Sequence, residues 1–230
     1  MSELELTSQI EDAHRMAGHE GQCFIRKFDQ FLGRGIVASG ENLSNISGHI
    51  QSITGIGLSH SLPHGASLKK IKIGEMIVVD IPTQYHGYHC DQSRTYVLGK
   101  SSEGCKSLYQ GMKEIADHVI KVLRPGIRCD YAYEVAISFA AKLNMDPFFM
   151  RLGVIRKKVF LIGHGVGLEL NEPPILSQNS KETIEEGMIF TLELEMTDGP
   201  KEVVKLEDTV LMTSEGIELL TFTPRDLHEV

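Results

Sequence analysis

Two pairs of acidic residues, each divided by a turn sequence, constrain the fold of this chain more than any other feature. Asp80 ends the apolar run 77–79, and Asp91 lies in the following segment 88–97. The position midway between them falls within Gln84–Gly87, which is typical of a turn. A simple hairpin centred there sets Asp80 directly opposite Asp91 on antiparallel strands.

The same arrangement is repeated near the C-terminus. Glu193 and Glu207 lie in two strand-like segments, and the position midway between them falls within Asp198–Lys201, a strong turn sequence. A second hairpin with Glu193 opposite Glu207 is therefore predicted. For either hairpin the alternative is a register slipped by one residue, which turns the acidic side chains toward solvent.

Facing acidic pairs need an explanation, because like charges directly opposite across a strand pair are destabilising. At a separation of about 5 Å and an effective dielectric constant near 20, the repulsion is roughly 3 kcal/mol per pair. A pair of divalent metal ions is the simplest cationic partner for both hairpins. The sequence thus indicates a metal centre built from Asp80, Asp91, Glu193 and Glu207.

Length and composition set wider limits. A chain of 230 residues, 41% of them hydrophobic, can bury a sizeable core as one large domain or two fused halves. Its 23 basic and 31 acidic residues give a net charge of −8, which disfavours nonspecific nucleic-acid binding. The N-terminus is acidic rather than apolar, and no uncharged apolar stretch is long enough to cross a bilayer. We therefore expect neither nucleic-acid nor membrane partners.

Cysteine usage bears on the compartment. The four cysteines are widely spaced and form no Cys-x-x-Cys unit; they are Cys23, Cys90, Cys105 and Cys129. This usage is typical of a reduced protein, and a cytoplasmic location is predicted.

Hydrophobic spacing predicts the helices. One is indicated within the first 32 residues by Ile10, Ala13, Ala17, Phe24, Phe28 and Phe31, and a short one around Asn42–Ile53 is a further candidate. Ser101–Glu103 opens an amphipathic helix that Arg124–Gly126 ends. Asp130 is the expected cap of another helix, whose inward residues are predicted to be Val135, Ile137, Ala140, Ala141 and Leu143.

The remaining segments are predicted to form strands. A short buried strand at 159–162 runs into Gly163–Gly167, and a final strand near Ile217–Thr221 follows the second hairpin. No helix alternates singly with strands, so the pattern favours an α+β fold with a mixed or antiparallel sheet. Because no linker or low-complexity tract interrupts the chain, residues 1–230 are predicted to form a single compact domain.

Three histidines are candidates for the same site. His164 lies between glycines that leave its imidazole open, and one nitrogen added to four carboxylates suits Mn²⁺, Co²⁺ or Fe²⁺ at least as well as Zn²⁺. Its alternative role is that of an ordinary loop residue. His64, between proline and glycine, faces either a cleft or solvent. His89 shares a strand face with Asp91, although solvent exposure is the expected outcome.

Together these segments resemble the pita-bread metallopeptidases, the family of methionine aminopeptidases, prolidases and aminopeptidase P. The resemblance lies in four stretches spread over most of the chain: Asp80–Thr95, with its Gly-Tyr, second Asp and Ser-Arg-Thr, then Gly163–Gly167, Phe190–Glu193 and Leu206–Val210. The resemblance implies a curved antiparallel or mixed sheet covered by helices, in two pseudo-symmetric halves.

The resemblance also implies a ligand set and a chemistry. Two divalent ions per chain (Mn, Co, Fe or Zn) would be held, in chain order, by Asp80, Asp91, His164, Glu193 and Glu207. A metal-bridging water or hydroxide would attack the peptide bond, and the metal charge would steady the tetrahedral intermediate. Glu193 would act as general acid and base as well as ligand. His64 would bind substrate or stabilise the oxyanion.

Within the family, the Xaa-Pro-cleaving branch is the closer match. Its sequences resemble Pro63–Gly65, Leu123–Gly126 and Leu219–Leu227 here. This implies a metalloaminopeptidase that cleaves Xaa-Pro bonds in small peptides with a free N-terminus. Whether the chain forms a homodimer is left open.

Several departures from the family pattern bear on activity. Asn171 stands where the family usually has a second histidine, Leu194 where a proline follows the fourth ligand, and Lys205 where many Xaa-Pro enzymes have arginine. Asn171 can still donate a hydrogen bond, whereas Lys205 keeps the charge without the planar bidentate contact. Both are candidate substrate-binding residues, and both are expected to reduce activity. The N-terminal creatinase-like domain typical of the branch is not found in this chain.

Two other functions remain open on the sequence alone. A protein that keeps the fold but has lost peptidase activity would serve as a binding or scaffold protein, which Asn171, Lys205 and the missing N-terminal domain favour. A creatinase-like amidinohydrolase is the other alternative, although that branch does not need the full metal set. The five ordered ligands favour the peptidase.

Overall fold

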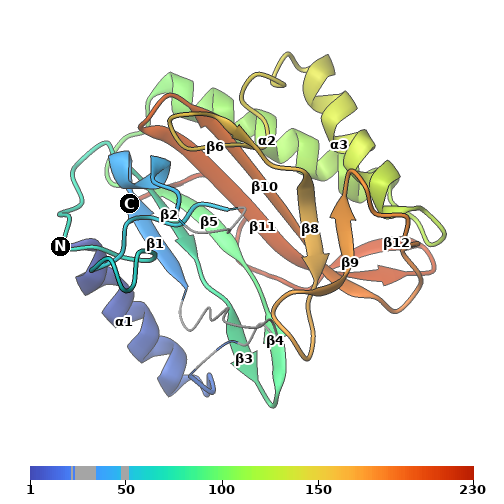
Figure 1. The fold of residues 1–230 in the computed structure, drawn as a ribbon, viewed down its shortest axis with the longest axis horizontal. Helices are drawn as coiled ribbons and strands as arrows, with labels where there is room; N and C mark the ends of the chain where they lie inside the picture. The colour runs from blue at the N-terminus through green and yellow to red at the C-terminus, as the bar shows by residue number, and fades with distance from the viewer. Residues whose placement is uncertain (22, 24–34, 48–51) are drawn as a thin grey trace.

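A large curved sheet organises the molecule (Figure 1). The computed structural model describes residues 1–21, 23, 35–47 and 52–230. Nine strands of these residues pair in one sheet, and seven of them follow the order β1-β2-β5-β11-β10-β8-β9, with every neighbouring pair antiparallel. Those seven are β1 Ile36–Ser39, β2 Met76–Asp80, β5 Ser93–Val97, β8 Leu161–Gly165, β9 Glu172–Ser177, β10 Ile189–Asp198 and β11 Glu202–Thr213.

Six further strands are short. β12 (Gly216–Leu219) pairs antiparallel with β11, and β13 (His228–Glu229) pairs parallel with β5. Two separate ribbons are formed by β3 Thr83–Tyr85 with β4 Tyr88–Cys90, and by β6 Arg151–Leu152 with β7 Lys157–Lys158. The sheet is therefore antiparallel except at β13, and the predicted final strand is confirmed as β12.

The first helix is shorter than its apolar pattern predicts. α1 spans Glu3–Met16 and opens with a capping box between Ser2 and Glu5. It ends at Ala17, because Gly18 takes a left-handed φ of +100° that a helix cannot continue. The three phenylalanines of the pattern, Phe24, Phe28 and Phe31, lie outside the described residues. Around Asn42 the chain forms a 3₁₀ helix, η1 (Gly40–Ser44), and residues 48–51 of that candidate helix are also outside the described part.

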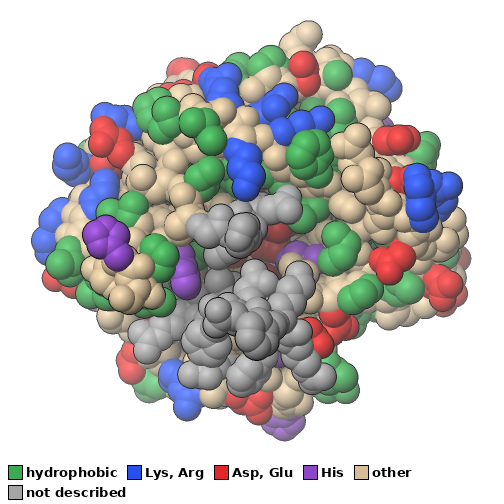
Figure 2. Space-filling model, viewed as in Figure 1, with side chains coloured by type: hydrophobic (Ala, Val, Ile, Leu, Met, Phe, Trp, Pro, Cys, Tyr) green, Lys and Arg blue, Asp and Glu red, His purple; other side chains and the backbone are tan. Residues whose placement is uncertain are grey.

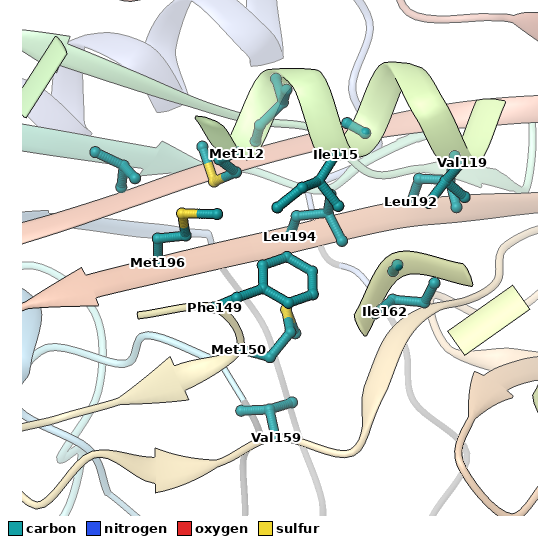
Figure 3. Close-up of a cluster of buried hydrophobic side chains, with 14 of the residues drawn as sticks. Met112, Ile115, Val119, Phe149, Met150, Val159, Ile162, Leu192, Leu194 and Met196 are labelled. Atoms are coloured by element: carbon teal, nitrogen blue, oxygen red, sulfur yellow. The ribbon is translucent and has the colours of Figure 1, made fainter. Parts of the chain in front are cut away.

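Helix α2 (Glu103–Val122) agrees with the prediction and covers the sheet. The Ser102 hydroxyl caps it by accepting a hydrogen bond from the Cys105 amide. Its apolar face packs on β10, as Figure 3 shows. The contacting side chains are Met112, Ile115 and Val119 of the helix and Leu192, Leu194 and Met196 of the strand.

Helix α3 (Cys129–Lys142) begins two residues before the predicted position, and two details of that prediction are wrong. The N-cap is Arg128, whereas Asp130 lies in the first turn and pairs with Arg128 and Lys181. Ala141 is exposed, whereas Ala140 is buried, and Val135, Ile137 and Leu143 are partly buried against the core as predicted. The fully buried stripe also includes Cys129, Ala132, Tyr133 and Ala136, at helical spacing.

Strand β10 separates the apolar core from a polar interior. Leu192, Leu194 and Met196 point to α2, and the alternation of a strand therefore turns Glu193 and Glu195 to the opposite face. Both glutamates are buried all the same, at 7% and 1% exposure. Acidic side chains held in such a position need partners, because burying an unpaired charge is costly.

The predicted register is confirmed in one hairpin and wrong in the other. In β10–β11, Glu193 lies directly opposite Glu207. In the first hairpin, Asp80 lies opposite Ser93 rather than Asp91. The turn is centred between His86 and Gly87, which both take left-handed φ values (51° and 80°) that suit a two-residue hairpin turn. This register differs from the predicted one by two residues, so Asp91 stays on the face that carries Asp80.

The surface shows no concentration of one charge on the face drawn in Figure 2, where basic and acidic side chains are interspersed among the described residues. Across residues 1–21, 23, 35–47 and 52–230, no helix combines the length and the apolar character that a membrane span requires.

Candidate metal centre

The five predicted ligands converge on the inner face of the sheet. Two groups of three have potential ligand atoms within 4.8 Å of one another, namely Asp91 with His164 and Glu207, and Asp80 with Glu193 and Glu207. All five residues are buried, with exposures of 8% or less. The structure therefore brings together from five strands or strand ends what the sequence places far apart.

Glu207 shows most directly that a cation fits here. Both of its carboxylate oxygens are buried and make no hydrogen bond among the described residues. The nearest basic atoms are Lys205 Nζ, 3.7 Å from Oε2, and His164 Nε2, 3.9 Å from Oε1. Buried carboxylate oxygens without hydrogen bonds are rare in folded proteins, and carboxylates with one imidazole are a donor set that suits divalent metals. The residues of the Asp91–His164–Glu207 group thus fit a metal ion.

Asp91 is positioned by a neighbouring strand rather than by its own hairpin. It lies in the gap between β4 and β5, outside either ladder. The Thr209 hydroxyl of β11 accepts a hydrogen bond from the Asp91 amide (3.1 Å) and donates one to the Asp91 carbonyl (2.7 Å). These two bonds take the place of ladder bonds and hold the carboxylate next to Glu207.

His164 is held in one orientation by the backbone carbonyl of the next residue, Gly165. Its Nδ1 lies 3.0 Å from the carbonyl oxygen of Gly165, which accepts a hydrogen bond and so assigns the ring hydrogen to Nδ1. Nε2 is then left with its lone pair directed toward Glu207, at 3.9 Å. A hydrogen bond from the far ring nitrogen is the usual way in which a metal-binding histidine is oriented.

The glycines beside His164 are required by close backbone approach. A Cβ atom at Gly163 would lie 2.0 Å from the carbonyl oxygen of Thr191 in β10, and one at Gly165 would lie 2.2 Å from that of Pro173 in β9. No side chain fits at either position. The glycine-rich sequence therefore lets β8 bring His164 between its two neighbouring strands.

Lys205 projects into the acidic cluster. Its Nζ lies 2.5 Å from Asp80 Oδ2, 2.6 Å from Glu193 Oε1 and 2.8 Å from the Ser52 hydroxyl. The side chain is 1% exposed. Among the described residues it is the ammonium group that balances the Asp80–Glu193 side of the cluster, a position the sequence interpretation had assigned to metal alone.

A fifth buried carboxylate was missed by the sequence interpretation. Glu195 lies directly opposite Lys205 in the β10–β11 ladder, with Oε1 3.8 Å from Nζ and 2.6 Å from the Ser52 hydroxyl that donates to it. The sequence indicates this position, because the turn that sets Glu193 opposite Glu207 also sets residue 195 opposite residue 205. Glu193 and Glu195 are two residues apart and so share a strand face.

Burial and mutual repulsion govern the protonation of the cluster. Burial, with repulsion from Asp80 in one case and Asp91 in the other, raises the pKa of Asp91 and of Glu207 well above the usual range. Burial also raises the pKa of Glu195, to about 8, although Lys205 opposes the shift. For Glu193 the effect of burial is outweighed by Lys205 and His164, so its pKa is lowered. Burial therefore disfavours the ionised form of Asp91, Glu207 and Glu195 in the metal-free cluster.

A buried ion-pair network joins the two acidic hairpins. Arg94 of β5 donates to Asp208 Oδ1 (2.6 Å) and to the backbone carbonyl of Glu207 (2.6 Å) in β11. Asp208 also pairs with Arg225 at 2.7 Å, and Arg94 donates to the carbonyl oxygens of Thr223 and Pro224. The network fixes the position of Glu207 and ties the chain after β12 to the sheet.

The other three candidate residues, His64, His89 and Asn171, belong to neither of the two ligand groups. His89 is buried rather than exposed, and both its amide and its Nδ1 bond to the carbonyl of Gly167, at 2.7 and 3.1 Å. Asn171 is half-buried and directly precedes β9. His64 is half-buried in the segment before β2. Among the described residues, neither Asn171 nor His64 makes a side-chain hydrogen bond to the acidic cluster.

Comparison with known proteins finds matches over most of the chain. The model of metallopeptidase family M24 matches residues 1–214. The chain is 31% identical to the Xaa-Pro dipeptidase of Pyrococcus furiosus over 199 residues, covering 84% of this chain and 55% of that protein. The chain therefore belongs to metallopeptidase family M24.

Solved structures agree as well. The chain superposes on the X-Pro aminopeptidase of Thermotoga maritima with a TM-score of 0.80 and 26% identity, covering all of this chain and 55% of that one. A methionine aminopeptidase from Thermotoga maritima shares the fold, with a TM-score of 0.71 and 20% identity over 96% of this chain and 85% of that one. The predicted pita-bread fold of the α+β class is confirmed. The chain spans about half the length of the curated relatives it matches.

Proposed function

We propose that this chain is the catalytic unit of a dinuclear metal-dependent aminopeptidase that cleaves Xaa-Pro peptides. The observation that carries the proposal is Glu207, a buried carboxylate that accepts no hydrogen bond from the described residues and belongs to both candidate ligand groups. Relatives named Xaa-Pro dipeptidase, from Pyrococcus furiosus and Pyrococcus horikoshii, support the substrate class.

Five residues would hold the two ions, namely Asp80, Asp91, His164, Glu193 and Glu207. When bound, divalent ions of this kind lower the pKa of water and polarise a peptide carbonyl. Manganese or cobalt suits this oxygen-rich set.

The remaining steps fall to side chains of this chain. Glu193 is proposed as the general acid and base, because Lys205 and His164 outweigh its burial and lower its pKa, which favours the carboxylate form. His64 would bind the substrate or stabilise its oxyanion. Asn171 would donate a hydrogen bond near the scissile bond through its amide. A free amino terminus on the substrate is expected, since a closed pocket accepts chain ends.

Metal loading tests the proposal. After reconstitution with Mn²⁺ or Co²⁺, elemental analysis should find close to two ions per chain, and Xaa-Pro peptides should be cleaved. Asp91→Ala should lose an ion and activity while remaining folded, whereas Asp146→Ala, which changes an exposed acid, should match the wild type. A protein that binds no metal at neutral pH would overturn the proposal.

Substrate tests separate this activity from its alternatives. N-acetylation of a good Xaa-Pro substrate should suppress turnover strongly, and equal cleavage of the blocked peptide would indicate a different hydrolase. Asn171→His should raise kcat/KM, because one positioned donor in such a site is typically worth about 10²–10³ in rate. Loaded protein that is inactive with either residue at 171 would favour a binding or scaffold role.

A further inference from the structure

The two halves of the sheet are built on the same plan. Strand β2 in the first half and β10 in the second each follow a glycine with a left-handed φ, Gly74 at 83° and Gly187 at 89°. The Gly74 amide donates a hydrogen bond to the carbonyl of Leu98 at 2.6 Å, and the Gly187 amide donates one to that of Met212 at 2.8 Å. Leu98 directly follows β5 and Met212 lies in β11, so the pair β2–β5 corresponds to the pair β10–β11.

Helices α1 and α3 correspond in the same way. Both have 14 residues, and each begins beside the segment that leads into β2 or β10. The Glu3 amide of α1 donates a hydrogen bond to the carbonyl of Lys69 at 3.0 Å. The Cys129 amide of α3 donates one to the carbonyl of Glu182 at 2.9 Å. Each half of the sheet therefore has one helix anchored at an equivalent position.

Helix α2 has no such counterpart among the described residues. The Met1 carbonyl accepts a hydrogen bond from the Ile71 amide at 3.0 Å, just as the Ile127 carbonyl accepts one from the Ile184 amide at 2.8 Å. Met1 therefore corresponds to Ile127, which comes shortly after the end of α2 at Val122. A helix that matched α2 would have to precede position 1, so the described part of the chain supplies no helix for its place.

That place is marked by a groove. Three residues of β10 lie under α2 and are at most 3% exposed, namely Leu192, Leu194 and Met196. Counted from the first residue of each strand, their counterparts are Val79, Ile81 and Thr83, which are half-buried. Together with Ile77, these counterparts form the floor of a cavity of about 520 Å³. The floor is therefore a largely apolar surface that the described residues cover only in part.

The walls of the groove suit a helix. Leu6, Ile10 and His14 recur at helical spacing along α1 and line the cavity. Leu220 and Thr223, from the chain after β12, line it as well. In the second half of the sheet, α2 packs on α3 and on the two long strands at once. A helix in the groove would pack on α1, β2 and β5 in the same manner.

The floor also indicates which helix fits. From Ile77 to Thr83 it is roughly 20 Å long, which matches about 13 residues of α-helix. Its side chains are smaller than those beneath α2, since Ile77 stands in the place of Phe190 and Val79 in the place of Leu192. Because protein interiors are densely packed, a helix that fills this groove must carry larger apolar side chains than α2 does.

We propose that this groove binds an amphipathic α-helix of a partner polypeptide. The helix lies on α1, β2 and β5 as α2 lies on α3, β10 and β11, and directs leucine or phenylalanine side chains at the floor. Val79 and Ile81 alternate with Asp80, so the groove is on the face of β2 opposite to the candidate metal ligands. Helix binding is therefore separate from the metal centre and goes beyond the proposed function.

A peptide based on α2 serves as the probe. It has the sequence of residues 101–126, with Ile115→Phe to fit the smaller floor. Fluorescence anisotropy of the labelled peptide, titrated with the full chain, should show saturable binding of one peptide per chain. The same peptide with Ile115→Asp carries a charge on its apolar face and should bind at least about tenfold more weakly. Equal binding of the two peptides would overturn the proposal.

Variants of the protein locate the binding site. Ile10→Lys puts a charge into the groove and should raise the Kd of the phenylalanine peptide at least about tenfold. Met16→Lys, at an 83% exposed position of the same helix that does not line the groove, is the control and should bind as the wild type does. Leu220→Lys, in the groove but outside α1, decides should Ile10→Lys fail to fold. Binding that no groove variant weakens contradicts the proposal, because the peptide then binds elsewhere.

A covalent version of the probe covers the case of weak binding. A copy of the phenylalanine peptide joined directly ahead of Met1, the position that α2 and its loop have relative to Ile127, raises the local concentration to about the millimolar range. This fusion should have a higher Tm than the same fusion with Ile115→Asp. Absence of binding by the free peptide together with equal Tm values would rule out a helix in the groove.

Sedimentation of the wild type alone tests a second copy of the chain as the occupant. We expect no dimer that depends on the groove. A concentration-dependent dimer that Ile10→Lys abolishes would replace the proposal by self-association. Because none of these measurements involves metal or activity, their failure leaves the proposed peptidase intact, and failure of metal binding leaves the groove intact.

Discussion

The two acidic hairpins place their carboxylates by different means. In β10–β11 a continuous ladder of ten residue pairs sets Glu193 opposite Glu207. In the first hairpin the ladder breaks between β4 and β5, and Asp91 lies in the break, held by Thr209 of the other hairpin. A regular ladder thus fixes one pair, whereas contacts across the sheet fix the other. Changes to the cross-sheet contacts should therefore disturb the centre more than changes to either turn.

The largest effect is expected where the hairpins are joined. Asp208→Ala leaves Arg94 with a buried, unpaired charge, and both side chains are only 2% exposed. Breaking a buried pair in this way typically costs about 3–5 kcal/mol. Urea unfolding of the metal-free protein measures the loss. Lys106→Ala, which removes an exposed pair with Glu103, is the control and should change the free energy of unfolding by less than about 0.5 kcal/mol. Similar losses in both variants would contradict the structure.

A somewhat smaller effect is expected from Gly165→Ala. The added Cβ would lie 2.2 Å from the Pro173 carbonyl oxygen, so β8 and β9 must separate. Overpacking of this kind costs roughly 1–3 kcal/mol, and we expect a value near the upper end because the opposing atom belongs to the backbone. Gly104→Ala in α2, where no atom comes closer than 3.5 Å, should be neutral or stabilising. Thermal unfolding of the two variants makes the comparison.

Thr209→Val tests whether Asp91 depends on β11. The change keeps the shape but leaves the buried Asp91 amide without its acceptor, which typically costs about 1–3 kcal/mol. Affinity for Mn²⁺ should also fall, by roughly 10- to 100-fold, because Asp91 loses its support. Thr209→Ser keeps the hydroxyl and should preserve the metal affinity. Unchanged metal binding in Thr209→Val would show that the first hairpin positions Asp91 by itself.

The smallest effects are expected at the two turns. Gly87 and Gly199 have nearly the same left-handed φ, 80° and 79°, and an added Cβ would meet no atom within 4 Å at either. Alanine there costs only backbone strain, about 1–2 kcal/mol at each site. Chemical denaturation should therefore give matching losses for Gly87→Ala and Gly199→Ala. A much larger loss at one turn would mean that this turn also sets the register of its hairpin.

The different ways in which the two hairpins place their carboxylates also explain why the sequence predicted one register and not the other. The β10–β11 register could be predicted because turn and strands are continuous, so the midpoint of the glutamates is also the midpoint of the ladder. The register of the first hairpin was predicted wrongly because His86, a non-glycine residue, adopts a left-handed φ. This conformation shifts the centre of the turn by one position. Convergence of the five ligands on one centre was still anticipated, since a two-residue shift leaves Asp91 on the same face.

Other parts of the centre had weaker signals. The opposition of Glu195 and Lys205 follows from the predicted ladder, yet Lys205 was interpreted as a substrate contact because the resemblance drew attention to it. Ser52 lies in an irregular segment, and no periodicity indicates that its hydroxyl links Lys205 to Glu195. The burial of His89 depends on a hydrogen bond to the carbonyl of Gly167. Because Gly167 is distant in sequence, local sequence patterns do not predict this contact.

The join between β5 and β11 has a consequence for how the chain folds. Neighbours within each hairpin are close in sequence, whereas Ser93 and Glu207, the register pair of the join, are far apart in the chain. Contacts between distant residues carry a large loop-closure cost and tend to form late. We therefore expect Asp91 and Glu207 to come together late in folding, when this contact forms. A bound ion would therefore slow unfolding while leaving the folding rate nearly unchanged.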